Sequence, residues 1–181
     1  LNTSGSTPAY YSGFPVDMAF NMFTTGTNAG LSDRLRGPKD LLPAYNYAEY
    51  TNSVKTFDYM DGYYSPTGVA NSNLYSWMWK RAPNYFDVVA YTGAYGGLTI
   101  NHSLGVVPEM MWVKARTGPS NVDWAVYHKD LDTDEYLFLN QNVATQGPRT
   151  IIWSDTRPTD SVVYAGGTTQ DPYTSSNNYT Y

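Results

Sequence analysis

The sequence has no cysteine and only two histidines, and each shortage removes a class of chemistry. Without cysteine, the chain can form no disulfide, no thiolate metal site and no cysteine nucleophile. The two histidines, His102 and His128, offer little material for acid–base catalysis. His102 precedes Ser103 on an expected strand, where adjacent side chains point to opposite faces and cannot form a dyad. We therefore expect no catalytic residues and a protein that is not an enzyme.

Charged side chains are also scarce, at 15% of the residues, and their balance is acidic. The 11 Lys and Arg residues are outnumbered by 16 Asp and Glu residues, and they are scattered instead of forming a stripe. Nucleic acid is therefore not an expected partner, since its phosphates require clustered cations. No apolar run approaches the ~20 residues of a membrane span, and the first residues do not resemble a signal peptide. The sequence predicts no membrane insertion.

What the chain has in excess is tyrosine, with 18 copies beside 5 tryptophans. Short runs rich in Val, Ile and aromatic residues are separated by Gly, Pro, Asn and Asp, a pattern typical of strands and turns. The runs that we predict as strands are residues 86–93, 98–104, 108–116, 123–129, 135–140 and 150–155. Only the segment 31–42 suggests a short helical turn, stopped by Pro38 and Pro43. We predict an all-β fold.

Two similar stretches 92 positions apart indicate an internal repeat: GFPVDMAF from Gly13 and GVVPEMMW from Gly105. This spacing gives four pairs of like chemistry, namely Gly13 with Gly105, Asp17 with Glu109, Met18 with Met110 and Phe20 with Trp112. Later the spacing becomes 104, which pairs Gly62 with Gly166, Asn73 with Asn177 and Tyr75 with Tyr179. A change of spacing indicates an insertion inside the second copy.

The repeat divides the chain into two related β-sandwich-like modules in tandem, residues 1–82 and 83–181. The strand expected at residues 86–91 has no counterpart before Gly13, so we interpret the first module as lacking its N-terminal strand. The second module stops where the first continues from Met78 to Lys80, so we interpret its last strand as truncated. The sequence is thus expected to be a fragment of a longer, fibre-like array.

The succession of motifs resembles a known family. SWMWKRAP, FDVVAYTG, NHSLGVVPEMMWVKAR, WAVYHKDL and YLFLN, in that order, are similar to a repeated domain of unknown function in tail-fibre-like virion proteins of marine bacteriophages, cyanophages especially. The first module, with GFPVDM, DRLRGPK and FDYMDG, looks like a diverged copy. The resemblance covers nearly the whole chain but concerns structural motifs, so it implies no catalytic or ligand residues. It implies a virion component that takes part in host attachment.

One segment combines carboxylates with aromatic rings, as a sugar site would. Asp58 and Asp61 lie among Tyr59, Tyr63 and Tyr64 in FDYMDGYY. Aromatic faces stack on the apolar faces of pyranose rings, and carboxylates accept hydrogen bonds from their hydroxyls. The competing interpretation is structural: Asp61-Gly62 is typical of a hairpin turn, and the tyrosines then cover a sheet face. We keep these five residues as the candidate glycan-binding set.

An acidic run from Asp130 to Glu135 has the spacing with which a calcium loop begins. Such a loop needs a glycine at its sixth position and a carboxylate at its twelfth, where this chain has Glu135 and Gln141. We interpret the run as a solvated turn and expect no metal ion and no other cofactor.

A separate expectation concerns the segment SWMWK, where Trp77 and Trp79 share one face of a predicted strand and Met78 lies on the other. We expect a strand covered on both sides, either by the core or by another subunit.

The function that these observations favour is a non-enzymatic virion protein, a tail fibre or other fibre on the particle surface. Its expected partners are further copies of itself, other virion proteins and host cell-surface polysaccharide. One alternative is a carbohydrate-binding module or polysaccharide depolymerase on such a fibre. Another is an extracellular surface or filament protein of a bacterium. Capsid and tail genes beside this one would separate the virion interpretations from the bacterial one.

Overall fold

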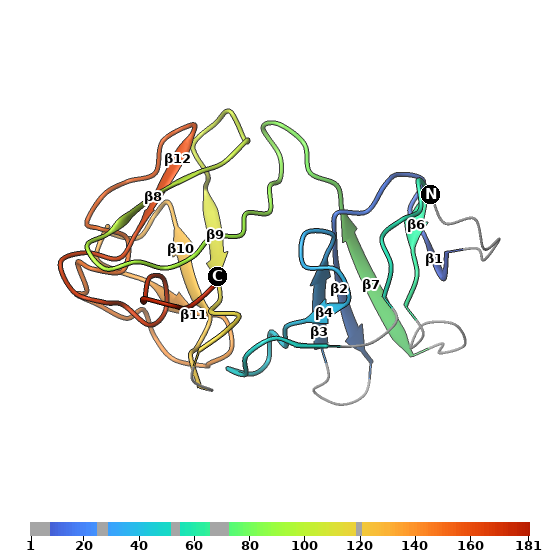
Figure 1. Ribbon diagram of the computed structural model, residues 1–181, viewed down its shortest axis with the longest axis horizontal. Helices are drawn as coiled ribbons and strands as arrows, with labels where there is room; N and C mark the ends of the chain where they lie inside the picture. The colour runs from blue at the N-terminus through green and yellow to red at the C-terminus, as the bar shows by residue number, and fades with distance from the viewer. Residues whose placement is uncertain (1–7, 25–28, 52–54, 66–72, 119–120) are drawn as a thin grey trace. The chain divides into compact units, whose positions relative to one another are not determined.

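A computed structural model describes residues 8–24, 29–51, 55–65, 73–118 and 121–181, and over these ranges the secondary structure is entirely β. This confirms the predicted all-β fold in two tandem units (Figure 1). The strands are β1 (Tyr10–Tyr11), β2 (Met18–Phe23), β3 (Ala29–Asp33), β4 (Lys39–Asp40), β5 (Tyr50–Thr51), β6 (Gly62–Tyr63), β7 (Leu74–Trp79), β8 (Leu98–Asn101), β9 (Met110–Val113), β10 (Ala125–His128), β11 (Leu137–Phe138) and β12 (Val162–Ala165).

The chain changes from one compact unit to the other between Arg81 and Ala82. The first unit consists of Leu1–Leu42 and Glu49–Arg81, and the second of Pro43–Ala48 and Ala82–Tyr181. The short segment Pro43–Ala48 therefore belongs with the second unit although it lies within the first in sequence. There the indole Nε1–H of Trp124 donates to the carbonyl oxygen of Tyr45, at 3.1 Å.

The first unit is built around a three-stranded antiparallel sheet in the order β3-β2-β7, joined by the pairs β1-β6 and β4-β5 (Figure 1). Side chains alternate between the two faces of β2. Ala19 points inward and packs with Val16, Phe57 and Tyr63 in a small core, which Met78 of β7 also contacts. Phe20 therefore lies on the outer face of the sheet.

The second unit contains a sheet in the order β11-β10-β9 and the separate pair β12-β8. Its largest core cluster contains Ala125, Tyr127, Tyr136, Ile152 and Trp153. Along β9, Met111 and Val113 pack against this cluster and Trp112 is exposed, whereas Lys114, just after the strand, is buried.

The two central hairpins are equivalent in register and in their end contacts. The N–H of Arg34 donates to the carbonyl oxygen of Asp17 at 2.8 Å, and the N–H of Lys129 donates to that of Glu109 at 2.8 Å. The same residues form ion pairs, with Arg34 Nε 3.1 Å from Asp17 Oδ1 and Lys129 Nζ 2.8 Å from Glu109 Oε1. The predicted pairing of Asp17–Met18 with Glu109–Met110 is therefore correct in this part of the repeat.

The second spacing of the predicted repeat is wrong. The carbonyl oxygen of Asn73 accepts from the N–H of Thr24, whereas the carbonyl oxygen of Thr180 accepts from the N–H of Arg116. Because Thr24 corresponds to Arg116 in the repeat, the counterpart of Asn73 is Thr180 and not Asn177. Asparagine and tyrosine recur throughout both loops, so the sequence alone offered a false alignment here.

Three local predictions also need correction. Residues 87–91 form no strand, and Phe86 makes only an isolated bridge to Ala82. Residues 150–155 form consecutive turns that bury Ile152 and Trp153 in the core, which explains why this run is apolar. The segment suggested as a helical turn begins with the end of β3 and continues into a turn and β4, because Leu31 pairs with Leu41 across it.

The two units fill equivalent interior positions with opposite chemistry. Ser32 pairs with Ala19 in the first hairpin, and Tyr127 pairs with Met111 at the same place in the second. On the next strand, Asp40 pairs with Tyr50 in the first unit, and Tyr136 pairs with Gln146 in the second. A pair of tyrosines in the second core thus corresponds to a serine and an aspartate in the first.

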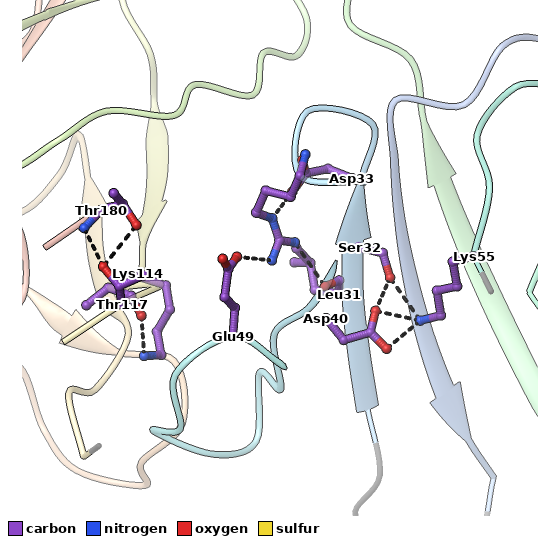
Figure 2. Close-up of polar contacts among 11 residues, drawn as sticks. Leu31, Ser32, Asp33, Asp40, Glu49, Lys55, Lys114, Thr117 and Thr180 are labelled. Atoms are coloured by element: carbon purple, nitrogen blue, oxygen red, sulfur yellow. Dashed lines mark hydrogen bonds and ion pairs between the residues drawn. The ribbon is translucent and has the colours of Figure 1, made fainter. Parts of the chain in front are cut away.

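In the first unit these polar groups are neutralised by Lys55, whose Nζ lies 2.7 Å and 2.8 Å from the two carboxylate oxygens of Asp40 and donates to Ser32 Oγ at 2.9 Å (Figure 2). Ser32 Oγ in turn donates to Asp40 Oδ1. The Lys55 and Asp40 side chains are only 3% and 2% exposed. Burial lowers the pKa of Lys55, and the attraction of Asp40 opposes that shift.

Replacing Lys55 by Met should destabilise the first unit by about 3–5 kcal/mol, because Asp40 would remain buried without a counter-ion. The double variant Lys55→Met/Asp40→Leu should recover most of the loss, since an apolar pair has nothing to desolvate. Urea denaturation followed by tryptophan fluorescence measures both. Lys80→Met, at an exposed lysine, is the matched control. A Lys55→Met variant as stable as this control would contradict the structural role of the ion pair.

Candidate functional site

The structure buries one of the five residues of the predicted glycan set. Tyr63 is fully buried and stacks between Tyr10 and Phe57, with ring centroids 5.0 Å and 5.3 Å away. Its hydroxyl donates to Asn21 Oδ1 at 2.6 Å and is 2.9 Å from Ser76 Oγ. Burial raises the pKa of this tyrosine. Tyr63 is therefore a core residue and cannot contact a sugar, which corrects that part of the prediction.

The other four residues stay a prediction. Asp58 and Asp61 are exposed, and Tyr59 and Tyr64 are half-buried. Asp61 does not form the hairpin turn suggested by the Asp-Gly pair, because Gly62 begins β6. A Cβ at Gly62 would lie 2.0 Å from the carbonyl oxygen of Tyr10, so a glycine is required by the close approach of β1.

A different set of aromatic side chains is gathered on the outer side of the β3-β2-β7 sheet. The cross-strand partners are Phe20 with Trp77 and Met22 with Tyr75. We call these four residues the aromatic face. Met22 is 40% exposed, Tyr75 is 61% exposed and Trp77 is 43% exposed, whereas Phe20 is half-buried.

The rings of the aromatic face follow one another at short intervals. The ring centroids of Phe20 and Trp77 are 5.5 Å apart with an interplanar angle of 31°, and those of Trp77 and Tyr75 are 6.1 Å apart at 41°. Trp77 is therefore the middle ring of three. The strand expected at SWMWK is present as β7, but it is not covered on both sides, because Met78 packs against the core whereas Trp77 is 43% exposed on the opposite face. Met22 and Tyr75 were not expected on this surface. The signal was present in the alternation of MAFNMF and LYSWMW, which pair across the sheet.

The charges on this side of the sheet are neutralised within the protein. Asp33, the register partner of Met18, accepts from the backbone N–H of Arg36 at 3.0 Å and from its Nε. Arg36 also donates from Nη2 to the carbonyl oxygen of Leu31 at 3.0 Å, and its Nη1 lies 3.8 Å from Glu49. The side chains of Asp33 and Arg36 are each 4% exposed. These charges serve the fold, and the exposed rings present an uncharged surface.

The second unit has aromatic and methionine side chains at corresponding positions. Met110 and Trp112, the counterparts of Met18 and Phe20, are 53% and 42% exposed. The indole Nε1–H of Trp112 lies 3.2 Å from the sulfur of Met110. Both central strands therefore present an aromatic ring on the outer face, at the same place in the hairpin.

Lys114 takes the position that Met22 has in the first unit, and it is 5% exposed. Its Nζ donates to the carbonyl oxygen of Ala115 at 2.8 Å (Figure 2). Burial lowers its pKa to about 8, against a smaller opposing effect of Asp123. The amine is therefore partly deprotonated near neutral pH, a property that the sequence did not reveal.

The rings of both histidines contact neighbouring backbone or carboxylate groups. His102 Nε2 lies 3.2 Å from the carbonyl oxygen of Thr159, and its Nδ1 accepts from the N–H of Leu104 at 3.3 Å. His128 Nδ1 is 3.6 Å from Asp130 Oδ2. His102 was expected on a strand, but it directly follows the end of β8 at Asn101. Its side chain contacts backbone groups, in the hydrogen bonds given above.

The acidic run folds as a turn closed by its own side chains. The N–H of Asp132 donates to Glu135 Oε2 at 3.1 Å, and Thr133 Oγ1 donates to Asp155 Oδ1 at 2.5 Å. Within the residues that the structure describes, no three His, Cys, Asp or Glu side chains are grouped to hold a metal ion. Over the same residues, no helix is long and apolar enough to cross a membrane.

The fold and the outward rings define a protein of two tandem β-units, each with an aromatic ring on the outer face of its central hairpin. The chain belongs to the family of a domain of unknown function, DUF7483, whose family model matches residues 6–181 and thus extends over both units. No curated protein and no solved structure matches the chain.

The lowered pKa of Lys114 predicts that stability rises with pH. Between pH 8 and 10.5 the unfolded chain holds a proton on Lys114 that the folded protein has lost, so raising the pH favours the folded state. From pH 7 to 9.5 Lys114 should contribute a gain of about 2 kcal/mol to the free energy of unfolding. Urea denaturation across this range measures it. Lys114→Met should reduce the rise by this amount relative to both the native chain and Lys80→Met, since Lys55 and the buried tyrosines contribute equally to all three proteins. An unchanged slope in Lys114→Met would contradict the assignment.

Proposed function

We propose that this chain is a non-enzymatic structural part of a fibre-like virion protein that takes part in host attachment. The observation that carries the proposal is the repetition of one hairpin in two tandem units. Each hairpin has the same backbone bond and ion pair at its end, formed by Asp17 with Arg34 and by Glu109 with Lys129. Tandem copies of one β-unit are typical of proteins that extend by stacking modules.

The repeated outward rings support an attachment role. Phe20 and Trp112 occupy the same place in the two hairpins, and both hairpins have a methionine two positions earlier. Surfaces that recur along one chain bind a repetitive target through several weak contacts at once, because each bound contact raises the effective concentration of the next. A polysaccharide on a host cell surface is such a target.

The most buried carboxylates have structural roles. Asp33, Asp40 and Asp171 are all at least 97% buried, and each is paired with a cation: Arg36, Lys55 and Arg149 respectively. Asp171 also accepts from the N–H groups of Tyr173 and Thr174, at 2.8 Å and 3.2 Å. Carboxylates that are fixed in this way stabilise loops and strands, in keeping with a protein that binds instead of transforming its target.

The partners of the proposed protein are further copies of the chain, other virion proteins and host cell-surface polysaccharide. Its place is the outside of the particle, on a tail or another fibre. Aromatic side chains are enriched in protein interfaces, and exposed tyrosines outside the aromatic face, such as Tyr85 and Tyr95, suit contacts with neighbouring virion components.

Antibody labelling of purified phage particles tests the location directly. Gold-conjugated antibody against this chain should decorate fibres of intact particles in electron micrographs, and mass spectrometry of the same particles should detect its peptides. Particles that lack the encoding gene are the control. Absence of the chain from intact virions would contradict the proposal.

A second measurement separates attachment from catalysis. Beads that carry many copies of the chain should adsorb host envelope polysaccharide more strongly than the monomer does, with no release of reducing ends. Cleavage of the polysaccharide that disappears in Asp58→Asn or Asp61→Asn would instead identify a depolymerase.

A further inference from the structure

The aromatic face is an apolar surface of limited size. Tyr75, Trp77 and Met22 are 61%, 43% and 40% exposed. Because a whole aromatic side chain contributes roughly 150–250 Å², the exposed area of the face is on the order of 300 Å². Patches of this size on a monomer are often functional. A stable protein–protein interface covers about 800 Å² on each partner, so a second copy would need much more surface than this face offers.

The arrangement of the rings indicates an elongated ligand. Phe20 and Trp77 are neighbours across two strands, and Trp77 and Tyr75 are neighbours along β7, so a chain-like molecule can contact the three rings in turn. The centroid separations of 5.5 Å and 6.1 Å leave room for one small ring on each aromatic side chain. A ligand whose repeating units each have an apolar side fits this spacing.

The angles between the rings indicate whether the ligand is a single polymer chain or a crystalline polymer surface. Trp77 is inclined by 31° to Phe20 and by 41° to Tyr75. Three coplanar rings would suit the flat surface of a crystalline polymer, whereas inclined rings suit a single chain whose successive units are rotated. Asp33 and Arg36 are buried and paired, so the face provides no free charge for an ionic ligand.

We propose that the aromatic face binds a single chain of an uncharged, β-linked polysaccharide by stacking its pyranose rings on Phe20, Trp77 and Tyr75. The axial C–H bonds of such a sugar form an apolar face that can stack on an aromatic ring, and equatorial linkages leave these faces exposed along the chain. The inference rests on the proposed attachment function and identifies the class of polymer and the residues that contact it. Trp77, as the middle ring, makes the largest contribution.

Isothermal titration of the whole chain with cellohexaose tests the proposal. We expect saturable binding that Trp77→Ala weakens roughly tenfold or more and Tyr75→Ala weakens severalfold, as expected when a stacking ring is truncated. Oligogalacturonate, a charged hexamer of similar length, should bind much more weakly. Adsorption to crystalline cellulose should be weaker than binding to the soluble chain, because of the ring angles.

Tyr11→Ala is the matched control, since Tyr11 is 61% exposed in the same unit but lies on β1, outside the aromatic face. It should keep the affinity of the native protein. Circular dichroism and urea denaturation of each variant exclude loss of folding as the cause of weaker binding, and Trp77→Phe, which keeps a ring, should retain more affinity than Trp77→Ala.

Three results would overturn the proposal. They are no saturable binding of cellohexaose, equal affinity of Trp77→Ala and the native chain, and an oligomer that Trp77→Ala converts to a monomer in analytical ultracentrifugation. The last result would assign the face to a second copy. If the chain is found on virions but cellohexaose does not bind, only this inference fails, whereas binding without virion association would leave it standing and overturn the proposed function.

Discussion

The register of each central hairpin is the constraint on which the rest of the fold depends, and a backbone hydrogen bond and an ion pair hold it at the end of the hairpin. An acidic residue before the central strand binds a basic residue after its partner through both backbone and side chain, in Asp17 with Arg34 and in Glu109 with Lys129. Because side chains alternate along a strand, a register shift of one residue would exchange the two faces of the sheet. Fixing the register keeps Ala19 in the core and Phe20 on the surface.

One backbone scaffold tolerates two kinds of interior. Tyr127 and Tyr136 give the second unit an aromatic core, whereas the equivalent Ser32 and Asp40 surround Lys55 in the first. A buried ion pair contributes little net stability, because desolvation offsets the attraction, but it tolerates few alternative partners. The aromatic core of the second unit stabilises the fold through the apolar surface that it buries. The polar cluster around Lys55 in the first unit restricts which packing arrangements are possible.

Sequence reasoning succeeded where one local rule decided the structure. Period-two alternation identified β7, β9 and β10, and the acid-Met pair at Asp17 and Glu109 identified the equivalent hairpins. It failed where distant contacts decided. Residues 150–155 have strand composition, but the core needs Trp153 from a turn. Tyr63 lies in a segment whose composition suggests a sugar site, but its ring stacks between Tyr10 and Phe57 in the core. The outward rings combine strands distant in sequence, so no local pattern revealed them together.

The segment Pro43–Ala48 has a consequence for how such proteins evolve. It lies in the sequence of the first unit but packs with the second, where Tyr45 provides the carbonyl that Trp124 requires. A recombination event at residues 81–82 would therefore transfer the second unit without one of its own pieces. An exchange that keeps the second unit intact must therefore carry residues 43–48 together with residues 82–181.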